Sequence, residues 1–419
     1  MASALGVSSG NYIDDETLYY QPAVLQIREK WPALDVVKDS LSATSPGYPW
    51  ILAGASLLVG PSLGVLRILN LAIGLFTLFV LGRTLCRKLG SLEAALLLLP
   101  VATSNYFLKS CCWLVTDNAS LLLVVCAFCA LLSDLGRSKP LILGLLLGAA
   151  VFVRQSNLWL VAPVAISVFF RLDCQDTSTP RIASRLLRVA IAVVPAALIF
   201  VWLLQSWGGL VPPRWLERAQ HFSLAPVVYL IALQGLLSMP FIAAIELSRP
   251  NRDARWLPML FGASIGLILA IVGETYADYA SGRWGGILWN VADATPVFAG
   301  RSVFLTMMAA LGGATIGWFA GELQFVENRR HFLIVALALF AFGLSFIPNR
   351  QAFHRYFEPT LLVLISLACM QIFRGGLRLS NRASAVLIVF GLVCLGVSAL
   401  LIFGANVTYG MRPPGFTGR

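Results

Sequence analysis

The stretch ASAVLIVFGLVCLGVSALLIF (residues 383–403) decides the fold class, because it runs for 21 residues without a charged side chain. A helix that crosses the hydrocarbon core of a bilayer needs about 20 apolar residues. Comparable apolar runs recur along the chain, at residues 62–85, 92–108, 118–136, 140–153, 157–171, 189–205, 225–246, 257–273, 300–321, 332–347 and 357–373. The twelve runs predict an all-α, polytopic transmembrane protein with about 12 membrane segments.

Three apolar stretches are short for full spans. Segments 140–153 and 157–171 are expected to tilt, or to pair around the polar break at Arg154 and Gln155. The stretch YPWILAGASLLVG (residues 48–60) is shorter still, which is typical of a membrane-surface or re-entrant piece. We therefore divide the chain into an acidic non-cytoplasmic loop with short interfacial segments (1–61), a transmembrane helical domain (62–403) and a short C-terminal tail (404–419).

The composition agrees with a multi-pass integral membrane protein. Of the 419 residues, 58% are hydrophobic and only 12% are charged, whereas a soluble domain has about 25% charged residues. The net charge of +11 could indicate a nucleic-acid partner, but the positions of the basic residues favour membrane orientation and no nucleic acid. Alternating loops hold seventeen of the thirty-one lysines and arginines, namely Arg83, Arg87, Lys88, Arg137, Lys139, Arg171, Arg181, Arg185, Arg188, Arg249, Arg252, Arg255, Arg329, Arg330, Arg374, Arg378 and Arg382.

Basic loops are expected on the cytoplasmic side of a membrane protein. The opposite, non-cytoplasmic face then holds residues 1–47, 109–117, 206–224, 274–299 and 348–356. The start MASALGVSSG has no apolar core that could carry the acidic N-terminal stretch across. Either an N-terminal span is missing from the chain, which we favour, or residues 1–47 translocate behind the first hairpin.

Polar residues that interrupt apolar sequence all fall on this non-cytoplasmic face. They are Asp14, Asp15, Glu16, Asp117, Arg154, Gln155, His221, Arg350, His354, Arg355 and Glu358. Ionisable groups at membrane depth are costly and indicate function. Carboxylates can take up a proton, and arginines can hold phosphate through two parallel hydrogen bonds. The pattern predicts a site at the outer membrane–water boundary.

Each of these residues also has a structural interpretation. The loop acids could simply be solvated, Asp117 could cap a helix, and Arg154 could anchor at the interface by extending its side chain to water. The sequence contains no phosphate-binding glycine loop, His-Glu-x-x-His motif or nucleophile elbow. The eight cysteines lack metal-ligand spacing, so we expect no metal and no cofactor beyond the substrates. A transporter would place its ionisable groups near the membrane midplane.

Several motifs resemble, in the same order along the chain, those of the dolichyl-phosphate-glucose α-1,2-glucosyltransferase family, which belongs to the GT-C membrane glycosyltransferases. They are DDETLYYQPAVLQ (14–26), ATSPGYPW (43–50), LRILNL (66–71), LVTDNAS (114–120), VFVRQSNLWLV (151–161), GGLV (208–211), HFSLAPVVYL (221–230) and NRQAFHRYF (349–357). Two features depart from the family. This chain lacks the family's N-terminal span, and it has PPRWLERAQ where the family has a Gly-Asp pair and a His.

The resemblance implies a GT-C-like enzyme whose first non-cytoplasmic loop is catalytic. It would move a hexose, glucose in the family, with inversion from a polyprenyl-phosphate (dolichyl-phosphate-type) donor to a lipid-linked or envelope glycan acceptor. Asp15 would be the base, with Glu16 orienting it or binding the acceptor and Asp14 peripheral. Arg154, Arg350 and Arg355 would bind the leaving phosphate, assisted by His221 and His354, while Asp117 and Gln155 would contact substrate.

The donor's lipid tail would lie in an apolar groove between spans. The membrane would be the plasma membrane in a bacterium or the endoplasmic reticulum in a eukaryote. Two other functions stay open at this point. One is a lipid or ion transporter with an outward polar vestibule, and the other is a structural membrane subunit without activity.

Overall fold

In the computed structural model, the chain is described at residues 15–34, 37–38, 40–170, 182–216, 222–249, 256–278, 283, 286–349, 351–375 and 377–409. The described part is almost entirely helical. Its one sheet is a hairpin of two short strands, β1 (Val297–Phe298) and β2 (Arg301–Ser302), with two residues each.

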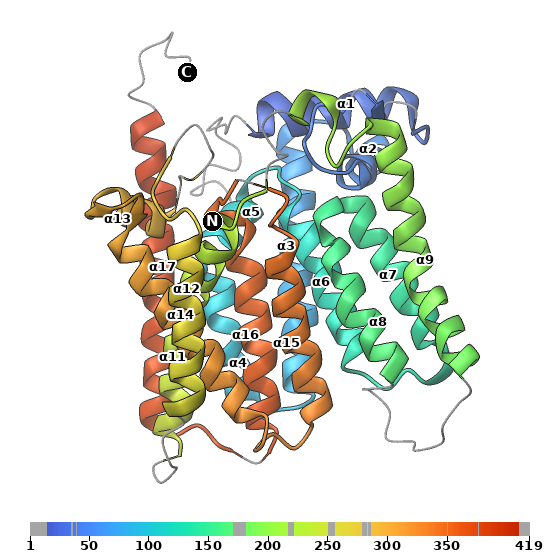
Figure 1. The fold of residues 1–419 in the computed structure, drawn as a ribbon. Coiled ribbons are helices and arrows are strands. Elements are labelled where there is room, and N and C mark those ends of the chain that lie inside the picture. Colours follow the sequence, from blue (N-terminus) through green and yellow to red (C-terminus); the bar gives the residue numbers. More distant parts are fainter. Residues whose placement is uncertain are drawn as a thin grey trace.

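Successive long helices run in alternate directions between the two ends of one bundle (Figure 1). Within the described residues, seven helical segments are long and apolar enough to cross a membrane. They are α3 (Leu63–Cys86), the segment Gly136–Val153 that contains α7 (Lys139–Val153), α9 (Ile182–Trp207), α11 (Ala225–Leu247), α14 (Val303–Glu322), the segment His354–Phe373 that contains α16 (Glu358–Phe373), and α17 (Asn381–Tyr409) over Asn381–Ile402. The chain is a polytopic helical membrane protein, as its apolar runs predict.

The remaining predicted segments are bent or shorter apolar helices. A bent pair, α4 (Ser91–Thr103) and α5 (Asn105–Cys112), makes an eighth span if it counts as one. The others are α2 (Gly47–Val59), α6 (Asp117–Leu131), η4 (Gln155–Leu160) with α8 (Val161–Phe170), α12 (Trp256–Val272) and α15 (Arg329–Leu344). The run 92–108, expected to be continuous, therefore forms two helices.

The bend between α4 and α5 measures 65° and occurs at Ser104, whose backbone is extended. Such a break frees backbone groups that water cannot reach inside a membrane. Neighbouring helices supply the partners. The Ser398 hydroxyl of α17 donates to the Thr103 carbonyl at 2.8 Å, and the Tyr106 N–H donates to the Glu358 carboxylate of α16 at 3.2 Å. The break is thus built into the packing of three helices.

Small residues bring α12 and α14 into close contact. A Cβ atom at Gly262 would lie 2.1 Å from the Gly313 carbonyl oxygen, and one at Gly266 would lie equally close to the Ala309 carbonyl. Helices in lipid associate through such close backbone approach, because apolar side chains gain little by leaving lipid. At the centre of the bundle, α16 is buried on nearly all sides.

Short elements gather at the end of the bundle where α3 begins. A π-helical turn (Glu16–Tyr20) leads into α1 (Gln21–Lys30), which lies with α2 across this end (Figure 1). The short α13 (Ile287–Asp293) and the turn η6 (His354–Tyr356) belong to the same end. The connections that hold most of the unusual polar residues therefore meet in one place.

Candidate active site

Glu16 anchors the N-terminal segment to the transmembrane bundle. Its carboxylate accepts two hydrogen bonds from Arg67 of α3, at 2.8 Å from Nε and 2.5 Å from Nη2, and one from the Leu114 N–H at 2.8 Å. Both side chains of this ion pair are sealed from solvent. Because an arginine and a backbone N–H hold this carboxylate, its neighbour Asp15 has a fixed position.

Asn70, one helical turn beyond Arg67, extends the same anchor. Its amide group donates to the Trp113 carbonyl at 2.7 Å and to the Ser110 carbonyl, and its oxygen accepts a hydrogen bond from Tyr48 of α2 at 3.0 Å. One face of α3 thus ties α2 and the connection between α5 and α6 to the N-terminal segment.

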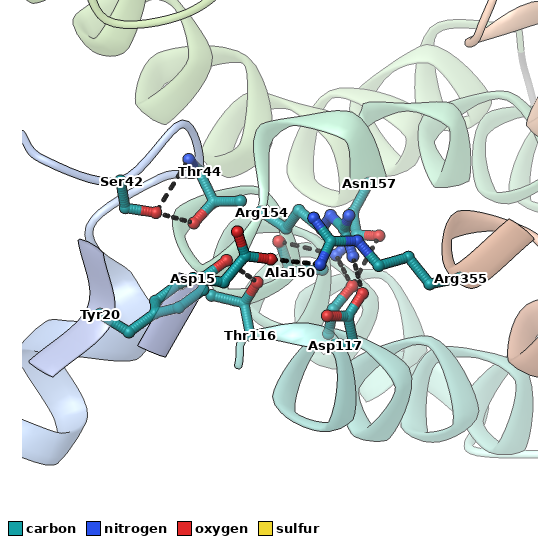
Figure 2. Close-up of polar contacts among 11 residues, drawn as sticks. Asp15, Tyr20, Ser42, Thr44, Thr116, Asp117, Ala150, Arg154, Asn157 and Arg355 are labelled. Carbon is teal, nitrogen blue, oxygen red and sulfur yellow. Dashed lines mark hydrogen bonds and ion pairs between the residues drawn. The ribbon is translucent and has the colours of Figure 1, made fainter. Parts of the chain in front are cut away.

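Asp15 forms an ion pair with Arg355 of η6, a residue 340 positions along the chain (Figure 2). Both side chains are partly exposed. The guanidinium of Arg355 also lies 5.3 Å from the ring centroid of Tyr356, within the range of cation–π attraction. The chain therefore brings an early carboxylate and a late guanidinium together at one end of the bundle.

Asp117 and Arg154 form a second ion pair beside the first, at 2.7 Å (Figure 2). Asp117 opens α6, while Arg154 has an extended backbone between α7 and η4. The Arg154 guanidinium lies 5.0 Å from the same Tyr356 ring centroid that Arg355 contacts. Burial lowers the pKa of Arg154, but Asp117, Tyr356 and Tyr20 together more than offset this, so the net pKa is raised and the charge persists.

Tyr20 supports the acidic side of this group. Its hydroxyl shares a 3.1 Å hydrogen bond with Thr116, the residue before Asp117 (Figure 2). Burial raises the pKa of the Tyr20 phenol, and the negative charges of Asp117 and Asp15 raise it further. Tyr20 is therefore a neutral hydrogen-bonding group and a poor candidate for a base.

These four charged side chains line one cavity of about 390 Å³. Hydroxyl and aromatic residues complete its wall, namely Tyr19, Tyr20, Ser42, Thr44, Tyr106, Trp215, Phe353, His354 and Tyr356, together with Ala43 and Gln351. Two carboxylates and two guanidiniums share a partly enclosed space with hydroxyl donors. Such a space can bind an anionic, polyhydroxylated molecule and move a proton within it.

His354 lines the cavity and is buried. Its Nδ1 shares a 2.9 Å hydrogen bond with the Tyr229 hydroxyl, and its Nε2 lies 2.7 Å from the Glu358 carboxylate. Its ring stacks on Tyr106 with centroids 5.0 Å apart. On another side Gly286, at a φ of +112°, approaches so closely that a Cβ there would lie 2.4 Å from the His354 Cβ. The turn that carries Arg355 is therefore tightly held.

Gln155 faces away from the charged group. Its side-chain oxygen accepts from the Ser45 N–H at 2.9 Å and from the Ser45 hydroxyl at 3.0 Å, and its amide donates to the Ala43 carbonyl at 2.9 Å. It thereby holds the segment that carries Thr44 in the wall of the charged cavity. Gln155 also lines a second, largely apolar cavity of about 770 Å³ between η4, α8, α9 and α15. Consecutive residues, Arg154 and Gln155, thus border a charged and an apolar cavity.

The residues predicted for the site separate into three groups. Asp15, Asp117, Arg154, His354 and Arg355 line one cavity. Glu16 and Gln155 lie outside its wall and hold elements that form it. Asp14, His221 and Arg350 lie outside the described residues.

Sequence reasoning missed Arg67, Tyr20 and Tyr106. Arg67 carried a usable signal, because it is a charged residue inside the apolar run 62–85. Tyr20 and Tyr106 carried no such signal in the sequence, since their roles depend on partners far along the chain. Among the described residues no group of three or more His, Cys, Asp or Glu side chains could hold a metal ion.

Comparisons with known proteins leave the chain without a family. No protein-family model matches it, and no curated protein matches its sequence. Among solved structures, the fold has a likeness to ArnT from Cupriavidus metallidurans in the apo state. The TM-score is 0.40 and the sequence identity 12%, over 86% of this chain and 72% of that chain. At these values the likeness does not assign a family.

Proposed function

We propose that this protein is an inverting membrane glycosyltransferase of the GT-C kind, which transfers a hexose from a polyprenyl-phosphate donor to a hydroxyl acceptor. One observation carries the proposal. Two carboxylates and two arginines meet in a cavity at one end of a transmembrane bundle, directly beside a large apolar cavity. A lipid-phosphate sugar needs both environments, because its head is anionic and hydroxylated and its tail is apolar.

Asp15 is the base in this proposal. A hydroxyl is a weak nucleophile until a positioned group takes its proton, and such general base catalysis contributes about 10²–10⁴-fold to rate. The acceptor oxygen forms a bond to the anomeric carbon while the bond from that carbon to the phosphate oxygen breaks. Asp15 receives the proton and polyprenyl phosphate leaves. One carboxylate on the attacking side suits inversion, by analogy with inverting sugar hydrolysis.

Arg154 and Arg355 bind the leaving phosphate. Negative charge grows on that phosphate as the glycosidic bond breaks, and donors already in place for this charge lower the barrier most where water is scarce. Both guanidiniums line the cavity and lie near the Tyr356 ring, at 5.0 Å and 5.3 Å from its centroid. Asp117, which holds Arg154 at 2.7 Å, remains near enough to accept a hydrogen bond from a sugar hydroxyl.

The pairing of Asp15 with Arg355 implies an order of events. The Asp15 Oδ2 atom already accepts a hydrogen bond from Arg355, so this oxygen is occupied. When the donor phosphate takes over Arg355, Asp15 is released to act as base. Donor binding therefore precedes activation of the acceptor in this proposal.

The remaining predicted residues receive supporting roles. Glu16, sealed against Arg67, is a structural anchor rather than a catalytic group. Gln155 shapes the border between the charged and the apolar cavity, and the latter accommodates the donor's polyprenyl tail. Glucose remains the proposed hexose on the motif resemblance, with a plasma-membrane location in a bacterium or an endoplasmic-reticulum location in a eukaryote.

The test is transfer from a panel of radiolabelled polyprenyl-phosphate hexoses, which includes glucose and mannose, to lipid extract from the source membrane. Purified wild-type protein should transfer label from one donor, and Asp15→Asn should not. The control is Asp134→Asn, which changes an acid at the opposite end of α6 from Asp117 and should transfer normally. Equal transfer by wild type and Asp15→Asn would overturn the base assignment. Flux of a lipid or ion without any transfer would favour a transporter.

A further inference from the structure

A third cavity, of about 180 Å³, lies between α5, α11, α16 and α17. Its wall is mostly apolar and comes from Leu233, Leu236, Leu237, Leu362, Phe390, Val393, Val397 and Leu401, among others. Leu236, Val393 and Leu401 are exposed on the outside of the bundle. The cavity therefore opens toward the lipid phase between α11 and α17.

This apolar cavity has a polar end where α5 begins. Asn105 is buried, lines the cavity, and its side-chain oxygen accepts no hydrogen bond from any described residue. A buried polar atom without a partner costs free energy and requires an explanation. A ligand hydroxyl or amide that donates to Asn105 would supply the missing hydrogen bond.

The polar end lies against the charged cavity. Tyr106 and His354 line both cavities, so they form the partition between them. The cavity that we assign to the donor tail meets the charged cavity elsewhere, at Arg154 and Gln155. The charged cavity thus has a separate apolar cavity on each of two sides, an arrangement that suits an enzyme with two lipid substrates.

A cation of α5 lies near the polar end of this cavity, outside its wall. The Lys109 ammonium, one turn along α5 from Asn105, lies 5.6 Å from the ring centroid of Tyr106 and 5.9 Å from that of Trp113. It forms no ion pair in the part of the chain that the structure describes. A half-buried ammonium between two aromatic rings attracts an anion such as a lipid phosphate.

We propose that this third cavity is the acceptor subsite, and that the acceptor is an anionic lipid with a hydroxylated head group. This inference rests on the proposed function and deepens it by naming the acceptor class. The tail lies between α11 and α17, the head group donates a hydrogen bond to Asn105, and the phosphate pairs with Lys109. A hydroxyl of the head group extends beside Tyr106 and His354, the two residues that both cavities share, toward Asp15.

Photolabelling tests the subsite without any sugar transfer. The probe is photoreactive phosphatidylinositol, an anionic lipid with hydroxyls on its head group, at low density in phosphatidylcholine vesicles that hold the full-length protein. Crosslinks should map to α11 and α17. Val397→Trp fills the cavity and should lower their yield about tenfold. The matched control Leu395→Trp, exposed on the same helix and outside the cavity wall, should leave the yield unchanged.

Head-group variants test recognition. Asn105→Ala and Lys109→Ala should each reduce phosphatidylinositol labelling to the level given by photoreactive phosphatidylcholine. Two results would overturn the subsite. One is equal labelling of this position by both lipids in the wild type, which would indicate contact with bulk lipid only. The other is labelling that Val397→Trp does not change.

Kinetics then separate failure of this inference from failure of the proposed function. With a transferring donor, Val397→Trp should raise KM for the lipid acceptor about tenfold and leave KM for the donor unchanged. Ala197→Trp, in the apolar cavity beside Gln155, should have the reverse effect. Specific photolabelling without sugar transfer from any donor would retain the lipid subsite and reject the glycosyltransferase. Transfer with unchanged acceptor KM in Val397→Trp would reject the subsite alone.

Discussion

The neighbouring residues Asp15 and Glu16 each form an ion pair with an arginine, and the two pairs lie in opposite environments. Asp15 and Arg355 border the charged cavity with side chains 28% and 34% exposed, whereas Glu16 and Arg67 lie outside its wall and are 0% and 2% exposed. Both pairs join a carboxylate to a guanidinium, so the chemistry is the same and the surroundings differ. The comparison teaches that exposure, rather than residue type, separates a group that can exchange partners from one that only holds the fold.

The physical reason lies in the cost of desolvation. A charge left unpaired in a sealed site lowers the stability of the fold by several kcal/mol, whereas a charge at a hydrated cavity can bind water or a ligand anion instead. The Glu16 carboxylate is therefore expected to keep its partners through a reaction cycle. Asp15 is expected to change partners within each cycle.

The largest effect should follow from Asp15→Asn at the open pair. This variant removes the proposed base, so kcat should fall about 10²–10⁴-fold. Donor binding should become tighter, because Arg355 no longer has a competing carboxylate. Radiolabel transfer measures kcat, and isothermal titration with the polyprenyl-phosphate sugar measures the affinity for the donor.

The control for this variant is Asp15→Glu, which keeps the charge and should keep part of the activity. Weaker donor binding by Asp15→Asn would contradict the exchange of partners at Arg355.

At the sealed pair, Glu16→Gln should instead lower stability. It leaves the Arg67 charge buried with a neutral partner, at a cost of about 3–5 kcal/mol in the free energy of unfolding. Denaturant unfolding in detergent micelles measures the change. Adding Arg67→Met should recover much of the loss, since an apolar replacement of a buried pair is often nearly neutral. Wild-type stability in Glu16→Gln would show that the comparison is wrong.

Arg154→Gln should have an intermediate effect, because Arg154 is less exposed than Arg355 and more exposed than Arg67. The loss of one charge-assisted contact to the leaving phosphate should raise the barrier by about 1.5–3 kcal/mol. The fall should appear in kcat, with the unfolding midpoint nearly unchanged. Arg154→Lys should restore part of the rate, and a loss of stability with normal kcat would place Arg154 with the structural anchor.

The smallest effect should come from Tyr20→Phe, which borders both regions. It removes the hydrogen bond to Thr116, worth about 0.5–1.5 kcal/mol. Because burial raises the pKa of Tyr20, the wild-type phenol stays neutral and the alkaline side of the pH–rate profile should not move. A shift of that side in Tyr20→Phe would assign Tyr20 a role in proton transfer.

Several transmembrane helices were predictable to within a few residues, because a bilayer demands apolar length and the sequence supplies it. The run 62–85 became α3 (Leu63–Cys86), and the run 225–246 became α11 (Ala225–Leu247). The bend at Ser104 was not predictable, since the partners that stabilise it, Ser398 and Glu358, come from distant helices.

The sequence by itself determined the class of the protein, the alternation of its spans and the end at which its polar residues gather. Hydropathy and charge act locally on each segment, so they can be read without knowledge of contacts. Only the tertiary structure decided that Asp15 faces Arg355 while Glu16 faces Arg67, because one residue of helical rotation sends neighbouring side chains in different directions. Burial of each partner then set which pair is sealed and which is open, and burial is a property of the whole packed bundle.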